Sequence, residues 1–170
     1  FGEFQYTQKY KEVPRDYYLE ASHIVRLRDY FLDLVIERDG NRWHYKEGAY
    51  ERLRQRWTPE CGIMWFLMCF KMNGCSPADV ALLRPSDCKR ISINGEDYWA
   101  IDIRRKKTSR DVHIRLKRDV LVTICLEHFL GSSEHFVYPM LYWKKDATDR
   151  YLLEHTTSHI RLLNTSVMRS

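Results

Sequence analysis

One stretch decides the fold: residues 72–88, which read MNGCSPADVALLRPSDC. Gly74 predicts the end of a preceding helix, because glycine accepts the left-handed conformation that the residue after a helix often adopts. Ser76 is expected at the N-cap of a short helix, with proline at the first helical position and Asp79 as the acidic partner of a capping box. Pro85 then stops this helix. The stretch therefore predicts two helices joined by a tight turn.

The segments before this stretch also predict helices. Residues 19–37 carry their apolar side chains on one helical face, and a turn follows at residues 39–41. A short polar helix is expected over 47–57. Thr58 is a favourable N-cap, with proline and an acid in the first turn after it. The following run, residues 61–72, is apolar nearly all round, which indicates a central helix buried on most sides.

After Pro85 the hydrophobic period changes from 3.6 to 2. Residues 90–93 and 98–105 read as strands, and Asn94-Gly95 between them is a strong signal for a two-residue hairpin turn. The alternation resumes at residues 112–116 after a polar connection. We expect a three-stranded antiparallel sheet between about Lys89 and Leu116, packed on the helices on one face. The fold class is α+β and mainly helical.

The C-terminal third shows a weaker pattern. Residues 116–130 predict a helix with Gly131 as the residue after its end. A short extended piece is expected over 136–139, and helical structure from about Asp149 onward. We divide the chain into an extended arm, residues 1–18, and one domain, residues 19–170.

Composition sets broad limits. The net charge is +5 and the pI is near 8.9, which permits an anionic partner. The five cysteines form no C-x-x-C pair, so we interpret them as buried apolar residues of a cytoplasmic protein. We expect no membrane span, signal peptide, cofactor or metal. Because the chain begins at Phe1 without Met, we expect it to be a piece of a longer protein.

The stretch that decides the fold resembles the tyrosine recombinases, or phage integrases. Their catalytic domains carry the pattern Gly-Leu-Arg-x-x-Glu-Leu-x-x-Leu-x-x-x-Asp, and five residues of this chain match it: Gly74, Asp79, Val80, Leu83 and Asp87. Ser76 stands where the family has its first catalytic arginine. The segment 105–108 resembles the Arg-x-Lys-Thr signature of the family's β2–β3 turn. Residues 137–141 resemble a short segment that follows in the family.

The resemblance implies DNA cleavage by a tyrosine, through a 3′-phosphotyrosine intermediate. Fixed cations stabilise the negative charge of the transition state, and a lysine protonates the leaving 5′ oxygen. Lys107 is the expected general acid, and Asp79 supports the active site. Ser76 cannot replace a guanidinium on phosphate, so Arg84 or a neighbour substitutes for it or the enzyme is weakened. The expected DNA-binding residues are Arg84, Arg104, Arg105, Lys106 and Arg110.

The resemblance also implies motifs that this chain lacks. The family's His-x-x-Arg and nucleophilic tyrosine do not appear after residue 141, and the letters of His-x-x-Arg at His23 to Arg26 stand too early. We expect a truncated catalytic domain that is inactive alone and whose parent forms protomer assemblies on double-stranded DNA in the nucleoid. The alternative is a catalytically inactive DNA-binding module with the same fold.

Other charged residues have simpler interpretations. A metal-dependent nuclease would use Glu96, Asp97, Asp102 and Lys106, but their spacing is poor for a shared ion. His155 and His159 share a helical face without a carboxylate at zinc spacing. The arginines at 52, 54 and 56 are interpreted as a solvated helix face.

Overall fold

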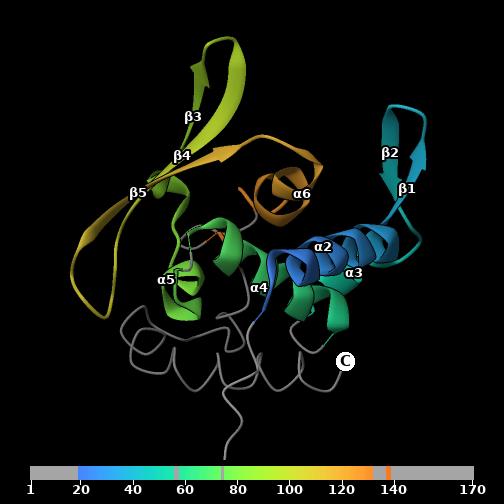
Figure 1. Cartoon of the computed structure of the whole chain (residues 1–170), viewed down its shortest axis with the longest axis horizontal. Coiled ribbons are helices and arrows are strands. Elements are labelled where there is room, and N and C mark those ends of the chain that lie inside the picture. Colours follow the sequence, from blue (N-terminus) through green and yellow to red (C-terminus); the bar gives the residue numbers. More distant parts are fainter. Residues whose placement is uncertain (1–18, 56–57, 74, 132–136, 139–170) are drawn as a thin grey trace, which may run out of the picture.

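A computed structural model describes residues 19–55, 58–73, 75–131 and 137–138 (Figure 1). The arm predicted over 1–18 and the helical structure predicted from Asp149 lie outside these residues. The helices are α2 (Ala21–Val35), α3 (Ala49–Leu53), α4 (Pro59–Lys71), α5 (Pro77–Ala81) and α6 (Val120–Val122). The strands are β1 (Ile36–Asp39), β2 (Arg42–Tyr45), β3 (Cys88–Ile93), β4 (Glu96–Arg104) and β5 (Asp111–Lys117).

The first helix is shorter than predicted, and a hairpin follows it. Helix α2 ends at Val35, and Ile36 opens a strand that pairs antiparallel with β2. The predicted turn at residues 39–41 is confirmed, with Gly40 at φ 59°. The sequence did not predict the two strands, because each has only four residues. In β1, three of the four residues are charged and exposed, so apolar and polar residues do not alternate.

Helix α4 forms the centre of the core, as predicted. The Thr58 hydroxyl caps it by accepting a hydrogen bond from the Cys61 amide at 3.3 Å. Most of its residues are buried, and it contacts α2, α3, α5 and the helical turn after α6. Arg52 is 39% exposed, as expected of a solvated helix face, but its Nε also donates to the buried Glu60 carboxylate at 2.5 Å, a contact that the sequence did not predict. Residue 56 lies outside the described residues.

Helix α4 ends at the predicted Asn73-Gly74 pair. Asn73, at φ 56°, adopts the left-handed conformation directly after the C-cap Met72, and Gly74 lies outside the described residues. Asparagine tolerates this region because its side chain is short and polar. The capping box is confirmed: the Ser76 hydroxyl accepts from the Asp79 amide, and the Asp79 carboxylate accepts from the Ser76 amide, both at 3.2 Å. A 3₁₀ turn over Pro85–Asp87 leads into the sheet.

The three-stranded antiparallel sheet is confirmed, in the order β3-β4-β5. Asn94 and Gly95 both have positive φ, as the predicted two-residue turn requires. The pairing places Ile101 between Cys88 and Ile114 on the face that meets the helices. The β3–β4 hairpin extends away from the helices at the top of the view, and the β1–β2 hairpin projects in the same direction further to the right (Figure 1).

The helix predicted over 116–130 is wrong at its start and in its geometry. Strand β5 continues to Lys117, and the Asp119 carboxylate caps α6 by accepting from the Val122 amide at 2.8 Å. A π-helical turn, η2 (Thr123–Glu127), then replaces the regular α-helix. Gly131 has the expected positive φ. Of the predicted extended piece over 136–139, the structure describes Val137 and Tyr138, both fully buried.

All five cysteines are free, and three of them are buried: Cys61, Cys75 and Cys125. This agrees with their interpretation as apolar core residues.

We expect Ile101→Ala to lower the free energy of unfolding by about 2–5 kcal/mol, because the side chain is fully buried and its removal leaves a cavity. Ile93→Ala is the matched control: this isoleucine lies in the same sheet but is 42% exposed, and should change stability by less than about 1 kcal/mol. Urea unfolding measures both variants. Equal losses would contradict the assignment of the buried face.

Candidate nucleic-acid interface

The connection between β4 and β5 is a closed polar turn. The Arg105 amide donates to the Arg110 carbonyl at 2.9 Å, and the Ser109 amide donates to the Arg105 carbonyl at 2.8 Å. Ser109 takes a positive φ of 53° to close the turn. The Arg104 side chain reinforces it, since its Nε donates to the Ser109 carbonyl at 3.1 Å. Five of the seven residues from 104 to 110 are lysine or arginine, so the turn presents a dense positive charge.

The base of this turn is attached to helix α5 through one carboxylate. Asp79 Oδ1 accepts from the Lys106 amide at 2.9 Å, and Oδ2 accepts from Arg105 Nε at 3.2 Å. Oδ2 also accepts from the Ser76 hydroxyl at 2.8 Å and from the Ser76 amide at 3.2 Å. The Asp79 side chain is 1% exposed. Four donors from two distant segments therefore converge on one buried group.

The electrostatics of Asp79 follow from these contacts. Burial by itself raises the pKa of this carboxyl group, but the hydrogen bonds from the Lys106 amide, Ser76 and Arg105 outweigh burial, so the pKa lies below its ordinary value. The negative charge acts on Cys75 in the opposite sense: burial and the nearby Asp79 raise the pKa of the Cys75 thiol, although Arg105 lowers it. Asp79 is thus ionised at neutral pH, and Cys75 is a protonated thiol.

A hollow of about 200 Å³ lies between α5, the 3₁₀ turn and the β4–β5 connection. Seven residues line it: Asp79, Leu82, Arg84, Asp87, Ile103, Arg104 and Lys106. The Asp87 carboxylate is engaged by the Arg84 amide at 2.9 Å. The lining thus combines three cationic side chains with two carboxylates that already accept hydrogen bonds from the protein. Such a hollow can receive a small anionic group.

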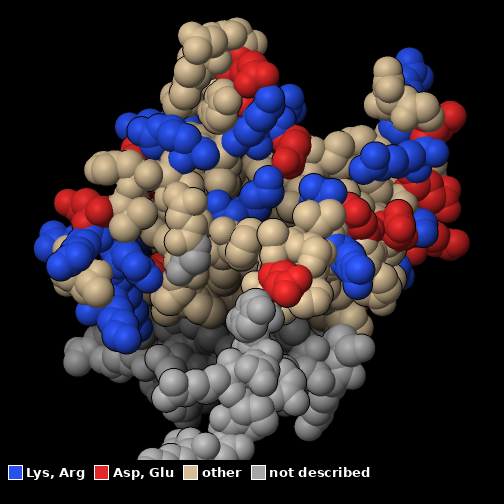
Figure 2. Space-filling model, viewed as in Figure 1, with Lys and Arg blue, Asp and Glu red and all other residues tan. Residues whose placement is uncertain are grey.

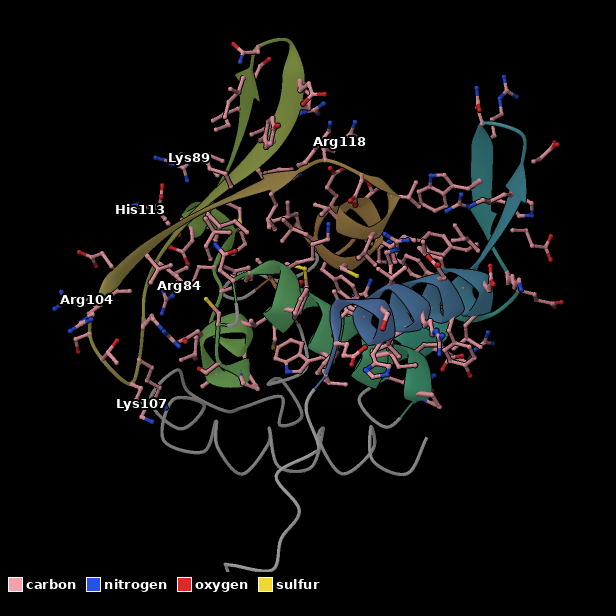
Figure 3. All side chains as sticks on the ribbon, viewed as in Figure 1. Arg84, Lys89, Arg104, Lys107, His113 and Arg118 are labelled. Atoms are coloured by element: carbon pink, nitrogen blue, oxygen red, sulfur yellow. The ribbon has the colours of Figure 1, made fainter. Side chains whose placement is uncertain are left out.

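Lys107 and Lys106 lie differently. Lys107 is exposed at the lower left end of the β4–β5 hairpin (Figure 3), whereas Lys106 lines the hollow. Basic side chains gather over this end of the β4–β5 hairpin, at the left of the space-filling view (Figure 2).

The structure thus brings together most of the residues that the sequence singled out. Ser76, Asp79, Arg105 and Lys106 are in direct contact, and Arg84 and Arg104 line the adjoining hollow. Lys107 and Arg110 lie on the same turn without entering the hollow. Sequence reading missed the contact between Arg105 and Asp79, which are 26 positions apart. Asp79 lies in the first turn of α5, where an acidic side chain is usually exposed. Its place in the sequence therefore did not indicate a buried contact with Arg105.

The acids of the hypothetical nuclease do not converge. Glu96 pairs with Lys117 at 2.7 Å, and Asp97 pairs with Arg90 at 2.8 Å. Asp102 contacts His113 at 2.7 Å and also Arg115. Among the described residues, no group of three histidines, cysteines or acids is arranged to hold a metal ion. The pair His155 and His159 lies outside the described residues.

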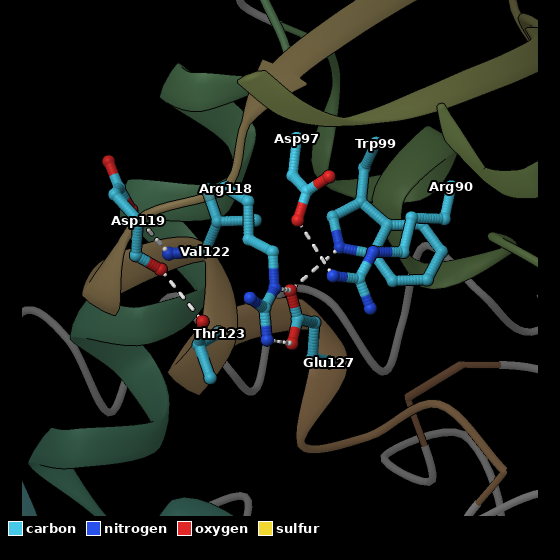
Figure 4. Close-up of polar contacts among 8 residues, drawn as sticks. All are labelled: Arg90, Asp97, Trp99, Arg118, Asp119, Val122, Thr123 and Glu127. Atoms are coloured by element: carbon cyan, nitrogen blue, oxygen red, sulfur yellow. Dashed lines mark hydrogen bonds and ion pairs between the residues drawn. The ribbon is translucent and has the colours of Figure 1, made fainter. Parts of the chain in front are cut away.

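A second polar cluster was not expected. Glu127, on the π-helical turn, accepts from Arg118 Nε at 2.6 Å and from the Trp99 indole at 2.9 Å (Figure 4). The neighbouring Arg90 is paired with Asp97. The cations of this cluster are matched by carboxylates, so it joins the sheet to the helices and presents less net charge than the β4–β5 turn. Its members are up to 37 positions apart, and no local pattern predicts it.

Comparison of the chain with protein-family models, with curated proteins and with solved structures found no match. The resemblance to the tyrosine recombinases therefore stays a prediction from the sequence. In the described part of the chain, no helix has both the length and the apolar character needed to span a membrane.

We expect Asp79→Asn to lower the free energy of unfolding by about 1.5–3 kcal/mol at pH 7. The asparagine side chain has no negative charge, and its NH₂ group would face the N–H and O–H donors that now bind the carboxylate. The folded-state pKa is depressed, so the carboxylate stabilises the protein above its ordinary pKa of 3.8, and this contribution is lost as the pH falls through the lower folded-state value. The difference between wild type and variant should therefore shrink below about pH 3.8.

Urea unfolding across pH measures this effect. Asp33→Asn, which removes an equal charge from the exposed face of α2, serves as the control and should show neither the loss nor its pH dependence. A difference for Asp79→Asn that stays constant down to pH 2 would contradict the assigned role.

Proposed function

We propose that this chain binds the backbone of double-stranded DNA through the β4–β5 turn and belongs to the catalytic domain of a tyrosine recombinase. The observation that carries the proposal is the cationic turn fixed to the helix α5 by the buried Asp79 carboxylate. In the longer protein, the substrate is a DNA phosphodiester and the reaction is strand breakage and rejoining by protomers assembled on DNA.

Charge density supports DNA as the partner. A duplex carries one negative charge per about 1.7 Å of its axis, and binding releases the counterions condensed on it. The turn concentrates five cations over residues 104–110, while the other basic residues of the sheet largely face carboxylates, as in the pairs Arg90–Asp97 and Lys117–Glu96. Among the described residues, Arg105 of the turn pairs with Asp79, and the five cations together give this end of the sheet a net positive charge.

The position of Lys107 supports the catalytic part of the proposal. Lys107 is exposed at the outer end of a turn whose base is held by hydrogen bonds, so an ammonium there can reach a leaving oxygen on a bound strand. A general acid must lie within hydrogen-bond reach of the atom it protonates. A projecting turn supplies that reach, and the attachment to Asp79 limits its motion.

The alternative is a DNA-binding module without activity. Ser76 favours it, because the serine serves as a helix N-cap and carries no charge that stabilises a transition state. The retained Lys107 favours the enzyme. The reading frame downstream of residue 170 distinguishes the two, since the enzyme needs a His-x-x-Arg motif and a tyrosine nucleophile there.

We expect this chain to bind duplex DNA with a Kd of about 10⁻⁴–10⁻⁶ M at physiological salt, with a log–log slope near −0.9 per phosphate neutralised. Replacing both Arg104 and Arg110 by alanine should weaken binding and reduce the slope by about 1.8, the value for two lost phosphate contacts. Fluorescence anisotropy between about 50 and 200 mM salt measures both quantities.

The matched control removes two exposed arginines from the β1–β2 hairpin, Arg38 and Arg42. This variant has the same net charge as the first one, but the hairpin lies at the other side of the molecule (Figure 1). Equal losses from the two variants would show that net charge alone drives binding, and binding that does not depend on salt would contradict the proposal.

In the longer protein, we expect Lys107→Ala to abolish most strand cleavage and leave DNA binding nearly intact. An interaction made only in the transition state changes the rate without changing ground-state affinity. Lys106→Ala is the control and should affect binding more than cleavage, because Lys106 lines the hollow. Cleavage of a suicide substrate and a gel-shift assay separate the two effects.

A substrate with a 5′-bridging phosphorothiolate gives a sharper test, because its sulfur leaving group needs no proton. It should restore cleavage by Lys107→Ala. Wild-type cleavage of the ordinary substrate by this variant would exclude Lys107 as the acid.

A further inference from the structure

Arg105 is held in an unusual way for a partly exposed arginine. Its Nε donates to Asp79 Oδ2 at 3.2 Å, and among the described residues this carboxylate is its one side-chain partner. The side chain is 33% exposed, whereas the Asp79 side chain is 1% exposed. The guanidinium is therefore anchored at its inner nitrogen, and within the described part of the chain no hydrogen bond engages its two terminal amino groups.

We propose that Arg105 is a phosphate-binding residue held in position by Asp79, and that it supplies the guanidinium that Ser76 lacks. The ligand is a phosphodiester of the DNA backbone. This inference rests on the proposed function for the source of the phosphate, but the binding chemistry applies to any phosphate oxygen.

Arg105 lies next to Ser76, the residue that the resemblance aligns with a catalytic arginine. The Ser76 hydroxyl and Arg105 Nε both donate to the same oxygen, Asp79 Oδ2, at 2.8 and 3.2 Å. The guanidinium therefore lies next to the Ser76 side chain, although it comes from the far end of strand β4. Under the proposed function, this guanidinium can take the place of the one that Ser76 does not supply.

The anchoring makes this arginine suited to phosphate. A guanidinium presents donors in a planar fork that matches two phosphate oxygens. Fixing the fork before the ligand arrives reduces the entropy lost on binding. Both Asp79 oxygens accept hydrogen bonds from the protein, so the carboxylate orients Arg105, while its negative charge offsets part of the guanidinium's attraction for phosphate.

The turn around Arg105 strengthens the site. The amide of the next residue, Lys106, donates to Asp79 Oδ1, so the backbone beside Arg105 is fixed by the same carboxylate. Arg84 and Arg104 line the adjoining hollow. Two further cations are thus near the Arg105 segment, although Asp79 and Asp87 line the same hollow.

The first test is Arg105→Lys. Lysine keeps the charge, but its single ammonium would be engaged by Asp79 and would leave no second donor group for phosphate. We expect affinity for a short DNA duplex to fall roughly tenfold, the effect of about one lost charge-assisted hydrogen bond. Arg118→Lys is the matched control, since this arginine is 39% exposed and its Nε and Nη2 both donate to Glu127. Its duplex affinity should stay within about twofold.

The second test is Asp79→Asn, for which two explanations predict opposite signs. If affinity depended on net charge alone, removing an acid would tighten binding. If Asp79 positions Arg105, the variant should bind more weakly than wild type even though it is more positive. Far-UV circular dichroism confirms that the variant is folded before binding is measured.

A third measurement is independent of DNA. Titrating inorganic phosphate should shift the Arg105 Nε–H resonance in nuclear magnetic resonance spectra of the wild-type chain, and Asp79→Asn should lose this shift. A phosphate shift without duplex binding would support the Arg105 site and overturn the proposed function. Duplex binding that is unchanged in both Arg105→Lys and Asp79→Asn would overturn the Arg105 site and leave the proposed function standing. Absence of both responses in wild type would overturn both.

Discussion

The arrangement of the candidate site depends on the buried carboxylate of Asp79. An isolated carboxylate at this depth would be costly, and it is tolerated because donors from Ser76, Arg105 and Lys106 surround it. These donors belong to a short helix and to a strand end that are far apart in the sequence. The requirement to satisfy one buried charge thus fixes the relative position of the two segments that make the site.

The core provides the frame in which this contact forms. Helix α4 is buried along most of its length, and the inner face of the sheet, including Ile101 and Ile114, packs on the same core. The buried Val137 amide donates to the Leu83 carbonyl at 2.7 Å, which ties a later segment to the end of the α5 region. Because these contacts hold α5 and the sheet in place, Asp79 meets the β4–β5 turn without further adjustment.

The basic residues divide into two groups with different consequences. Arg52, Arg90, Arg118 and Lys117 each pair with a carboxylate, and these pairs join elements of the fold. The cations of the β4–β5 turn gather at one end of the molecule, and one of them, Arg105, pairs with the buried Asp79. A net charge of +5 is modest for the whole chain, but its local distribution produces a surface suited to a polyanion.

The sequence by itself determined the local features. Ser76 with Asp79 specified the capping box, Thr58 specified the start of α4, and Asn94-Gly95 fixed the sheet's first hairpin, because each depends on residues only a few positions apart. Tertiary structure decided the features that depend on distant partners. These include the Arg105–Asp79 contact and the Glu127 cluster on the π-helical turn. Local propensity cannot encode such contacts, since they form only when the buried core brings the segments together.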